Sequence, residues 1–127
     1  MEKRLLQSHL VFPTHDISRT SEYYEKVLGF MAVKYLDMIE PHICLYRDDT
    51  EIILTVSQRQ EVIPNRELYG YGYDGYFITK NQEKLQQEFL DAGANITRLL
   101  STTDYHNKEF VVEDIDGRWI GFGIKQK

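Results

Sequence analysis

Apolar and polar residues alternate in eight stretches of the chain, and this period of two predicts β-strands. The first four stretches are Leu5 to Phe12, Phe30 to Asp37, Pro41 to Arg47 and Glu51 to Ser57. The other four are Tyr73 to Thr79, Asn95 to Ser101, Lys108 to Glu113 and Arg118 to Ile124. Asp116 and Gly117 form a strong tight-hairpin signal between the last two strands.

A helical period follows the first of these strands. Ile17, Tyr24 and Leu28 share one apolar stripe, and Asp16 or Ser18 can cap the start of the helix. Gly29 is placed to end it, because glycine readily adopts the left-handed conformation that closes a helix.

The same layout recurs in the second half of the chain. Thr14 to Phe30 and Ile78 to Ala94 have the same length, and their closing glycines, Gly29 and Gly93, align. The second helix is expected at Asn81 to Ala92. The order is therefore βαβββ twice, in one α+β domain of residues 1–127, with module one at about 5–57, a linker at about 58–71 and module two at about 72–125.

The faces of the predicted strands differ in chemistry. On Glu51 to Ser57, one face carries large apolar residues, whereas Glu51, Ile53 and Thr55 share the other. In module two, glycines occupy the corresponding faces of two strands. We expect Phe77 and Trp119 to lie on the same faces as these glycines. Such faces predict a concave, ligand-sized cleft, although each glycine could instead permit strand coiling or a bulge.

Composition narrows the possible partners. A formal net charge of −5 argues against nucleic acid, because phosphate binding needs a basic face. No apolar stretch approaches the length of a membrane span, and MEKRLLQSHL lacks the features of a signal peptide. We therefore expect a cytoplasmic protein with no membrane partner. Cys44, the only cysteine, is expected to be a buried structural thiol.

Several motifs within these predicted elements resemble those of a known protein family. The motifs that carry it are Asp16-Ile17-Ser18, Tyr23-Tyr24, Val27-Leu28-Gly29-Phe30, Phe110-Val111-Val112-Glu113-Asp114 and Asp116-Gly117. Over nearly the whole chain, Leu5 to Lys125, the sequence resembles the vicinal oxygen chelate superfamily, which includes glyoxalase I, bleomycin-resistance proteins, fosfomycin-modifying transferases and extradiol dioxygenases. The resemblance implies two βαβββ modules that form an open, bowl-shaped mixed sheet with helices outside, commonly in a homodimer.

The resemblance also implies where a metal would bind. Metal-dependent members of this family use ligands from the first, fourth, fifth and eighth strands, and these positions correspond here to His9, Ile53, Gly75 and Gly121. A shift in register could place Glu51 or Asp74 at a ligand position, but neither neighbour of Gly121 has a side chain that can bind a metal ion. One imidazole cannot hold a catalytic ion, so we expect no family-type metal site, no cofactor and no catalytic residue.

Two main functions remain open. The first is a metal-free binding protein, similar to the bleomycin-resistance branch, that sequesters an aromatic or cationic organic molecule. Its expected ligand contacts are His9, Val11, Glu51, Ile53, Thr55, Tyr71, Phe77 and Trp119. The alternative is a glyoxalase-like lyase or dioxygenase with an altered divalent-metal site that uses His9 and Glu51. In a third possibility, the homodimer itself is the functional surface.

Overall fold

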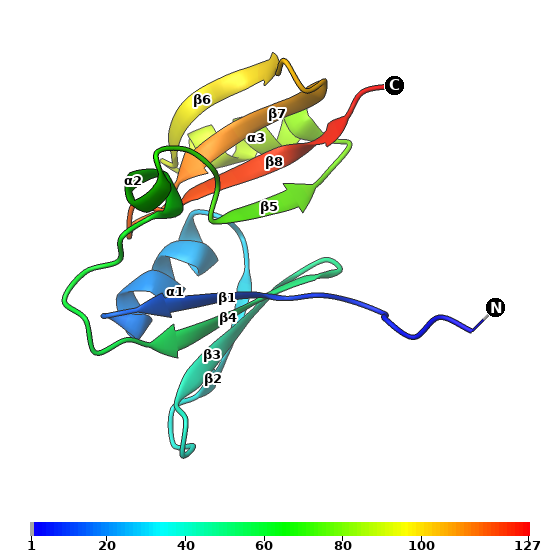
Figure 1. Cartoon of the computed structure of the whole chain (residues 1–127). Coiled ribbons are helices and arrows are strands. Elements are labelled where there is room, and N and C mark those ends of the chain that lie inside the picture. Colours follow the sequence, from blue (N-terminus) through cyan, green and yellow to red (C-terminus); the bar gives the residue numbers. More distant parts are fainter. Residues whose placement is uncertain (1) are drawn as a thin grey trace.

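The computed structural model describes residues 2–127, which form two four-stranded sheets and three helices (Figure 1). The first module contains β1 (Leu10–Thr14), α1 (Ile17–Lys26), β2 (Met31–Tyr35), β3 (His42–Arg47) and β4 (Thr50–Val56). The second contains β5 (Gly75–Ile78), α3 (Gln82–Asp91), β6 (Asn95–Thr102), β7 (Asn107–Glu113) and β8 (Trp119–Lys125). The repeated βαβββ order and the α+β class are confirmed.

Both sheets have the same topology. The strand order is β1-β4-β3-β2 in the first sheet and β5-β8-β7-β6 in the second, and neither sheet closes into a barrel. In each sheet the first strand pairs in parallel with the fourth, and the remaining pairs are antiparallel. No helix within residues 2–127 is long and apolar enough to cross a membrane.

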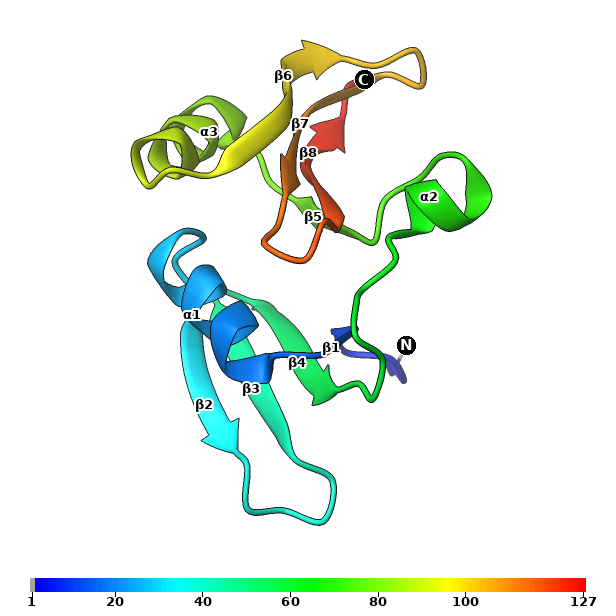
Figure 2. The ribbon, with the colours of Figure 1, turned by 90° about the vertical axis from the view of Figure 1, so that its left-hand side faces the viewer.

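The helices α1 and α3 lie on the same side of the two sheets (Figure 2). Asp16 caps the start of α1, because its side chain accepts a hydrogen bond from the backbone N–H of Arg19, and Gly29 follows the helix with a φ of 74°. One apolar core spans both modules on this side. Its members include Phe12, Tyr24, Leu28, Ile43, Leu54, Phe89, Phe110 and Phe122. We call the opposite surface of each sheet, which does not pack on α1 or α3, its open face.

One expectation about the chain outside this core is wrong. β1 begins at Leu10 and not at Leu5, and Leu5 and Leu6 are 91% and 83% exposed. The reason is that β4 begins only at Thr50, so the residues before Ser8 have no strand to pair with. The linker contains the short helix α2 (Asn65–Tyr69).

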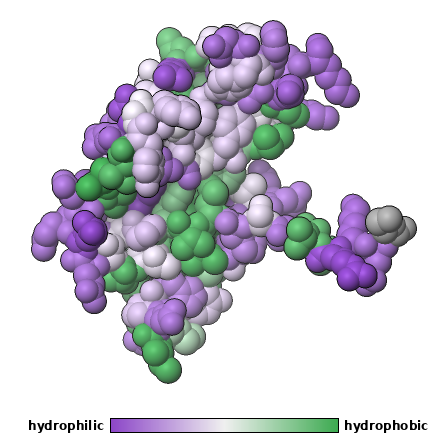
Figure 3. All heavy atoms as spheres, in the orientation of Figure 1, coloured by the Kyte–Doolittle hydropathy of each residue, from purple (hydrophilic) through white to green (hydrophobic). Residues whose placement is uncertain are grey.

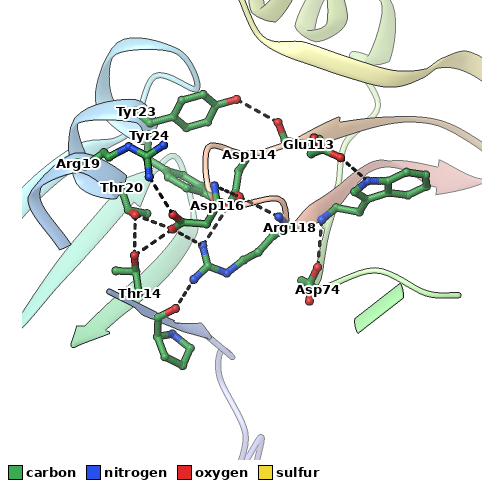
Figure 4. Close-up of polar contacts among 12 residues, drawn as sticks. Thr14, Arg19, Thr20, Tyr23, Tyr24, Asp74, Glu113, Asp114, Asp116 and Arg118 are labelled. Atoms are coloured by element: carbon green, nitrogen blue, oxygen red, sulfur yellow. Dashed lines mark hydrogen bonds and ion pairs between the residues drawn. The ribbon is translucent and has the colours of Figure 1, made fainter. Parts of the chain in front are cut away.

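A buried arginine connects the modules. Arg118, 2% exposed, lies at the turn between β7 and β8 and makes contacts of 3.1 Å with the carboxylates of both Asp114 and Asp116. Its other terminal nitrogen donates to the backbone oxygen of Pro13 in module one. This turn is thereby fixed to the end of β1 (Figure 4).

The two carboxylates of the turn also bind side chains of α1 and β1. Asp116 Oδ2 accepts hydrogen bonds from the hydroxyls of Thr14 at 3.0 Å and Thr20 at 2.6 Å. The Tyr24 hydroxyl donates to Asp114 at 2.6 Å. Burial raises the pKa of Asp114, although Arg118 and these hydrogen bonds oppose that effect. Turn formation alone therefore does not explain these acidic residues, because they join module two to module one.

Candidate functional site

The open face of the first sheet is a regular grid of side chains. The strand register places Val11 beside Ile53, and Ile53 beside Cys44. The neighbouring row contains His9, Glu51 and Tyr46. Four of the expected ligand contacts, His9, Val11, Glu51 and Ile53, therefore lie on one surface, and Thr55 follows Ile53 on it because side chains alternate along a strand.

Charge and apolar surface meet on this face. His9 Nε2 lies 3.3 Å from Glu51 Oε1, which forms an ion pair when the imidazole is protonated. The His9 side chain is 36% exposed and that of Glu51 is 16% exposed. Val11 beside them is 57% exposed. Cys44 is buried as expected, and burial raises the pKa of its thiol, so the thiol is not an activated nucleophile.

A hollow borders this grid at one edge. Its volume is about 300 Å³, and it lies between Val11 and Pro13 of β1, the linker at Val62 and Ile63, and Asp74 before β5. Figure 3, which views the open faces, shows hydrophobic side chains gathered near the middle of the molecule.

Trp119 lies on the open face of the second sheet, but its ring is already covered. The guanidinium of Arg66 in α2 is 3.9 Å from the ring centroid, and that of Arg98 in β6 is 5.0 Å from it. The indole N–H donates to Glu113 at 3.0 Å. Stacking of a ligand on Trp119 would require one arginine to move.

Three tyrosines surround a buried carboxylate on the same face. Glu109 is 3% exposed and accepts hydrogen bonds from the hydroxyls of Tyr73, Tyr76 and Tyr105. The Asn107 amide also donates to the Tyr76 hydroxyl at 3.0 Å. Burial, followed by the hydrogen bond to Glu109, raises the pKa of Tyr76 well above its usual value. This cluster was not anticipated from the sequence.

The glycines of β8 make room for this cluster and not for a ligand. A Cβ at Gly121 would lie 2.5 Å from Cδ2 of Tyr76. A Cβ at Gly123 would lie 2.4 Å from the backbone oxygen of Lys108. The expectation that these glycines open a cleft is wrong at both positions.

The expected position of Phe77 on the ligand-facing surface is also wrong. β5 pairs in parallel with β8 so that Phe77 lies opposite Phe122, and the two rings stack at 5.3 Å on the core side. Gly75 faces the core as well, because a Cβ there would meet Leu10 and Phe12. Tyr76 is therefore the β5 residue on the open face. Tyr71 lies outside both faces, in the linker, and is 81% exposed.

The donor set does not fit a family-type metal ion. His9 and Glu51 lie close together, but the Tyr76 ring covers Gly121, and the Tyr76 hydroxyl is bound to Glu109. Within residues 2–127, no three His, Cys, Asp or Glu side chains are arranged to hold a metal ion. Catalytic sites of this kind need about three protein ligands and an open position.

Comparisons with known proteins give a consistent family assignment. The family model described as Glyoxalase/Bleomycin resistance protein/Dioxygenase superfamily matches residues 6–122. The search of curated proteins gave no match.

Solved structures agree over almost the whole chain. A glyoxalase/bleomycin resistance protein/dioxygenase from Alicyclobacillus acidocaldarius is 16% identical with a TM-score of 0.75, covering 100% of this chain and 96% of its own. An integron cassette protein from V. cholerae is 26% identical with a TM-score of 0.65, covering 97% of each chain. A virulence protein from Salmonella typhimurium is 26% identical with a TM-score of 0.64, covering 99% of each chain.

Proposed function

The chain belongs to the Glyoxalase/Bleomycin resistance protein/Dioxygenase superfamily, and we propose that it sequesters a small organic molecule on the open face of its first sheet, without a metal ion. The observation that carries this proposal is the contrast between the two open faces. Val11 is 57% exposed beside the His9 and Glu51 pair, whereas Trp119 in the second sheet is covered by the protein's own arginines.

The chemistry of this face favours an aromatic or aliphatic ligand with a cationic group. Val11 and Ile53 supply an apolar floor, which contributes roughly 25 cal/mol for each Å² of apolar surface that a ligand covers. Glu51 supplies a carboxylate at the edge of that floor, partly screened from water. An ammonium group placed there would compete with His9 for Glu51.

Two valines of matched exposure test the location. Val11→Lys should weaken the binding of a cationic aromatic compound at least about tenfold, because a lysine would cover the floor and repel the ligand. Val56 is 53% exposed at the end of β4, outside the His9, Val11 and Ile53 grid, so Val56→Lys is the control and should leave affinity unchanged. Isothermal titration against a panel of aromatic amines and their neutral isosteres gives the readout. Equal affinity in both variants would refute the location.

Glu51→Gln tests the preference for charge. It should weaken the cationic members of the panel and leave the neutral isosteres unchanged, because the amide keeps the shape of the side chain and removes its charge. No saturable binding by any member would count against sequestration itself.

One observation favours an altered metal site, used by a glyoxalase-like lyase or dioxygenase. The 3.3 Å approach of His9 and Glu51 brings two possible ligands together. That function requires stoichiometric metal after purification without chelator, and a higher melting temperature on adding nickel, zinc, manganese or iron(II). A His9→Ala variant that retains both properties would place any such metal elsewhere.

The proposal includes a cytoplasmic homodimer as the working state of the protein. Sedimentation equilibrium of the full chain measures its mass directly, and a monomer at micromolar concentration would remove the dimer from the proposal.

A further inference from the structure

The internal repeat creates two comparable junctions between the modules. In one junction, the turn between β7 and β8 packs on α1, where Asp116 bonds to Thr20 and Asp114 to Tyr24. In the other, the turn between β3 and β4 packs on α3. When the helices are aligned on Gly29 and Gly93, Thr20 corresponds to Lys84, and Tyr24 corresponds to Glu88.

The second junction is held differently. Glu88 forms two hydrogen bonds with the guanidinium of Arg47, at 2.7 and 2.8 Å, and Arg47 also donates to the backbone oxygen of Leu28 at 2.7 Å. Lys84 takes no part in this contact. Among residues 2–127, the counterpart of the buried network is therefore the Arg47–Glu88 ion pair with the hydrogen bond from Arg47 to Leu28.

A cavity of about 460 Å³ occupies the remaining space of the second junction. Its wall includes four aromatic rings of the core, those of Phe30, Phe77, Phe89 and Phe122. Phe30, Phe89 and Phe122 are 6%, 1% and 3% exposed, whereas Phe77 is partly exposed and presents most of the accessible ring surface. The volume lies within the ~300 to 1,000 Å³ range typical of small-molecule sites. This cavity involves the helix side of the sheets and is separate from the His9 and Glu51 grid.

Apart from Arg47 and Glu88, which neutralise each other, the charged residues that line the cavity have opposite signs on its two sides. Lys84 comes from α3, and Asp48 and Asp49 come from the turn between β3 and β4. Among residues 2–127, neither Lys84 nor Asp49 has an ion-pair partner, and Asp48 only approaches Arg47 Nε at 3.9 Å. A ligand with a single charge would be attracted by one side and repelled by the other, whereas a zwitterion can satisfy both.

We propose that this cavity binds a small zwitterion with an aromatic side arm, of the chemical class of an aromatic amino acid. The ring packs against the accessible surface of Phe77, the carboxylate faces Lys84, and the ammonium group faces Asp48 and Asp49. Aromatic rings gain from offset or edge contacts with other rings at centroid separations of about 4.5 to 7 Å, which is the spacing within the wall itself.

Three probes that share a phenyl ring test the proposed class in the full-length protein. They are L-phenylalanine, phenylacetate and phenethylamine. The binding of each is measured by isothermal titration and by NMR saturation transfer from protein to ligand protons. The expected result is saturable binding of L-phenylalanine, with each singly charged probe at least about fivefold weaker. Absence of L-phenylalanine binding, or equal or tighter binding of either other probe, would overturn the proposal.

Matched lysines on the protein locate the site. Lys84→Gln should weaken L-phenylalanine about tenfold while leaving phenethylamine unchanged, because only the carboxylate loses its partner. Lys80 is exposed near the start of the same helix but does not line the cavity, so Lys80→Gln is the control. Val11→Lys separates this site from the open face. If Val11→Lys abolishes L-phenylalanine binding and Lys84→Gln does not, this inference fails whatever the fate of the open-face proposal.

Discussion

Replacement of Gly121 by alanine tests whether the Tyr76 ring, and not a ligand, fills the space above β8. The added Cβ would lie 2.5 Å from Cδ2 and 2.7 Å from Cε2 of Tyr76, closer than atoms can approach without movement. Tyr76 cannot move freely, because its hydroxyl is held by Glu109 at 2.9 Å and by Asn107 at 3.0 Å. The ring must therefore lose contacts or hydrogen bonds to make room for one methyl group.

The size of the effect follows from these two losses. Overpacking of a closely packed site costs about 1 to 3 kcal/mol, and a lost hydrogen bond to a charged group costs about 1.5 to 3 kcal/mol. The ring should lose only part of each, because Tyr76 is partly exposed and can shift outward. We therefore expect Gly121→Ala to lower the free energy of unfolding by about 2 to 4 kcal/mol.

Urea denaturation of a double-mutant cycle isolates the contact with the ring. In a Tyr76→Ala background the obstacle is gone, so Gly121→Ala should be neutral or stabilise by up to about 1 kcal/mol, since alanine restricts the unfolded chain more than glycine does. Gly123→Ala is the matched control. Its Cβ would meet the backbone oxygen of Lys108 at 2.4 Å, so Tyr76→Ala should not rescue it. An equal cost of Gly121→Ala in both backgrounds, or no cost in either, would refute the reasoning.

Three further predictions concern charge and burial. Arg118→Met should destabilise the protein by about 3 to 5 kcal/mol in urea, because it leaves buried carboxylates unpaired, whereas Arg19→Met, 47% exposed and 3.5 Å from Asp116, should cost less than about 1 kcal/mol. The Arg47 guanidinium lowers the pKa of Glu88, so the stability that the ionised Glu88 contributes is present above the ordinary carboxyl pKa and is lost as pH falls. Glu88→Gln should therefore flatten the acid side of a plot of unfolding free energy against pH. An unchanged slope would contradict this. Burial raises the pKa of Tyr23 to about 12, so its contribution to stability is lost as pH rises from the ordinary tyrosine value through 12, and Tyr23→Phe should remove one late-titrating group from an absorbance titration at alkaline pH.

The element order could be predicted because it depends on local pattern. The apolar alternation within strands, the stripe of Tyr24 and Leu28, and the helix-ending Gly29 act over a few residues, and all are visible in one sequence. The two modules repeat these signals, which made the fold class accessible.

The faces of β5 could not be predicted in the same way. Tyr76 and Phe77 are both large and aromatic, so alternation does not indicate which of them packs on the core. The register with β8 decides it, because Phe77 pairs with Phe122 and Tyr76 with Gly121. Gly121 carried the missing information, since a glycine opposite a large ring is typical of close packing as well as of an open pocket.

The helix in the linker and the bonds of the turn between β7 and β8 could not be predicted for a related reason. Proline fits immediately before a helix as well as in irregular chain, and Gly70 ends α2 with a φ of 92°. Asp114 and Asp116 occupy positions where turn formation suffices to explain acidic residues. Their partners in α1 lie about ninety positions earlier in the chain, beyond the reach of any local pattern.

The difference between the two junctions has a physical consequence for ligand binding. The first junction is filled by buried side chains that bond to one another through Asp114, Asp116 and Arg118, and such a network tolerates little movement. The second relies on Arg47 and Glu88, and the Glu88 side chain is 47% exposed, so water can replace either partner at small cost. We therefore expect a ligand bound in the second junction to displace the turn between β3 and β4 from α3 more readily than the turn between β7 and β8 from α1. The duplicated fold thus has one junction held by a buried network and one held by a half-exposed ion pair beside a cavity.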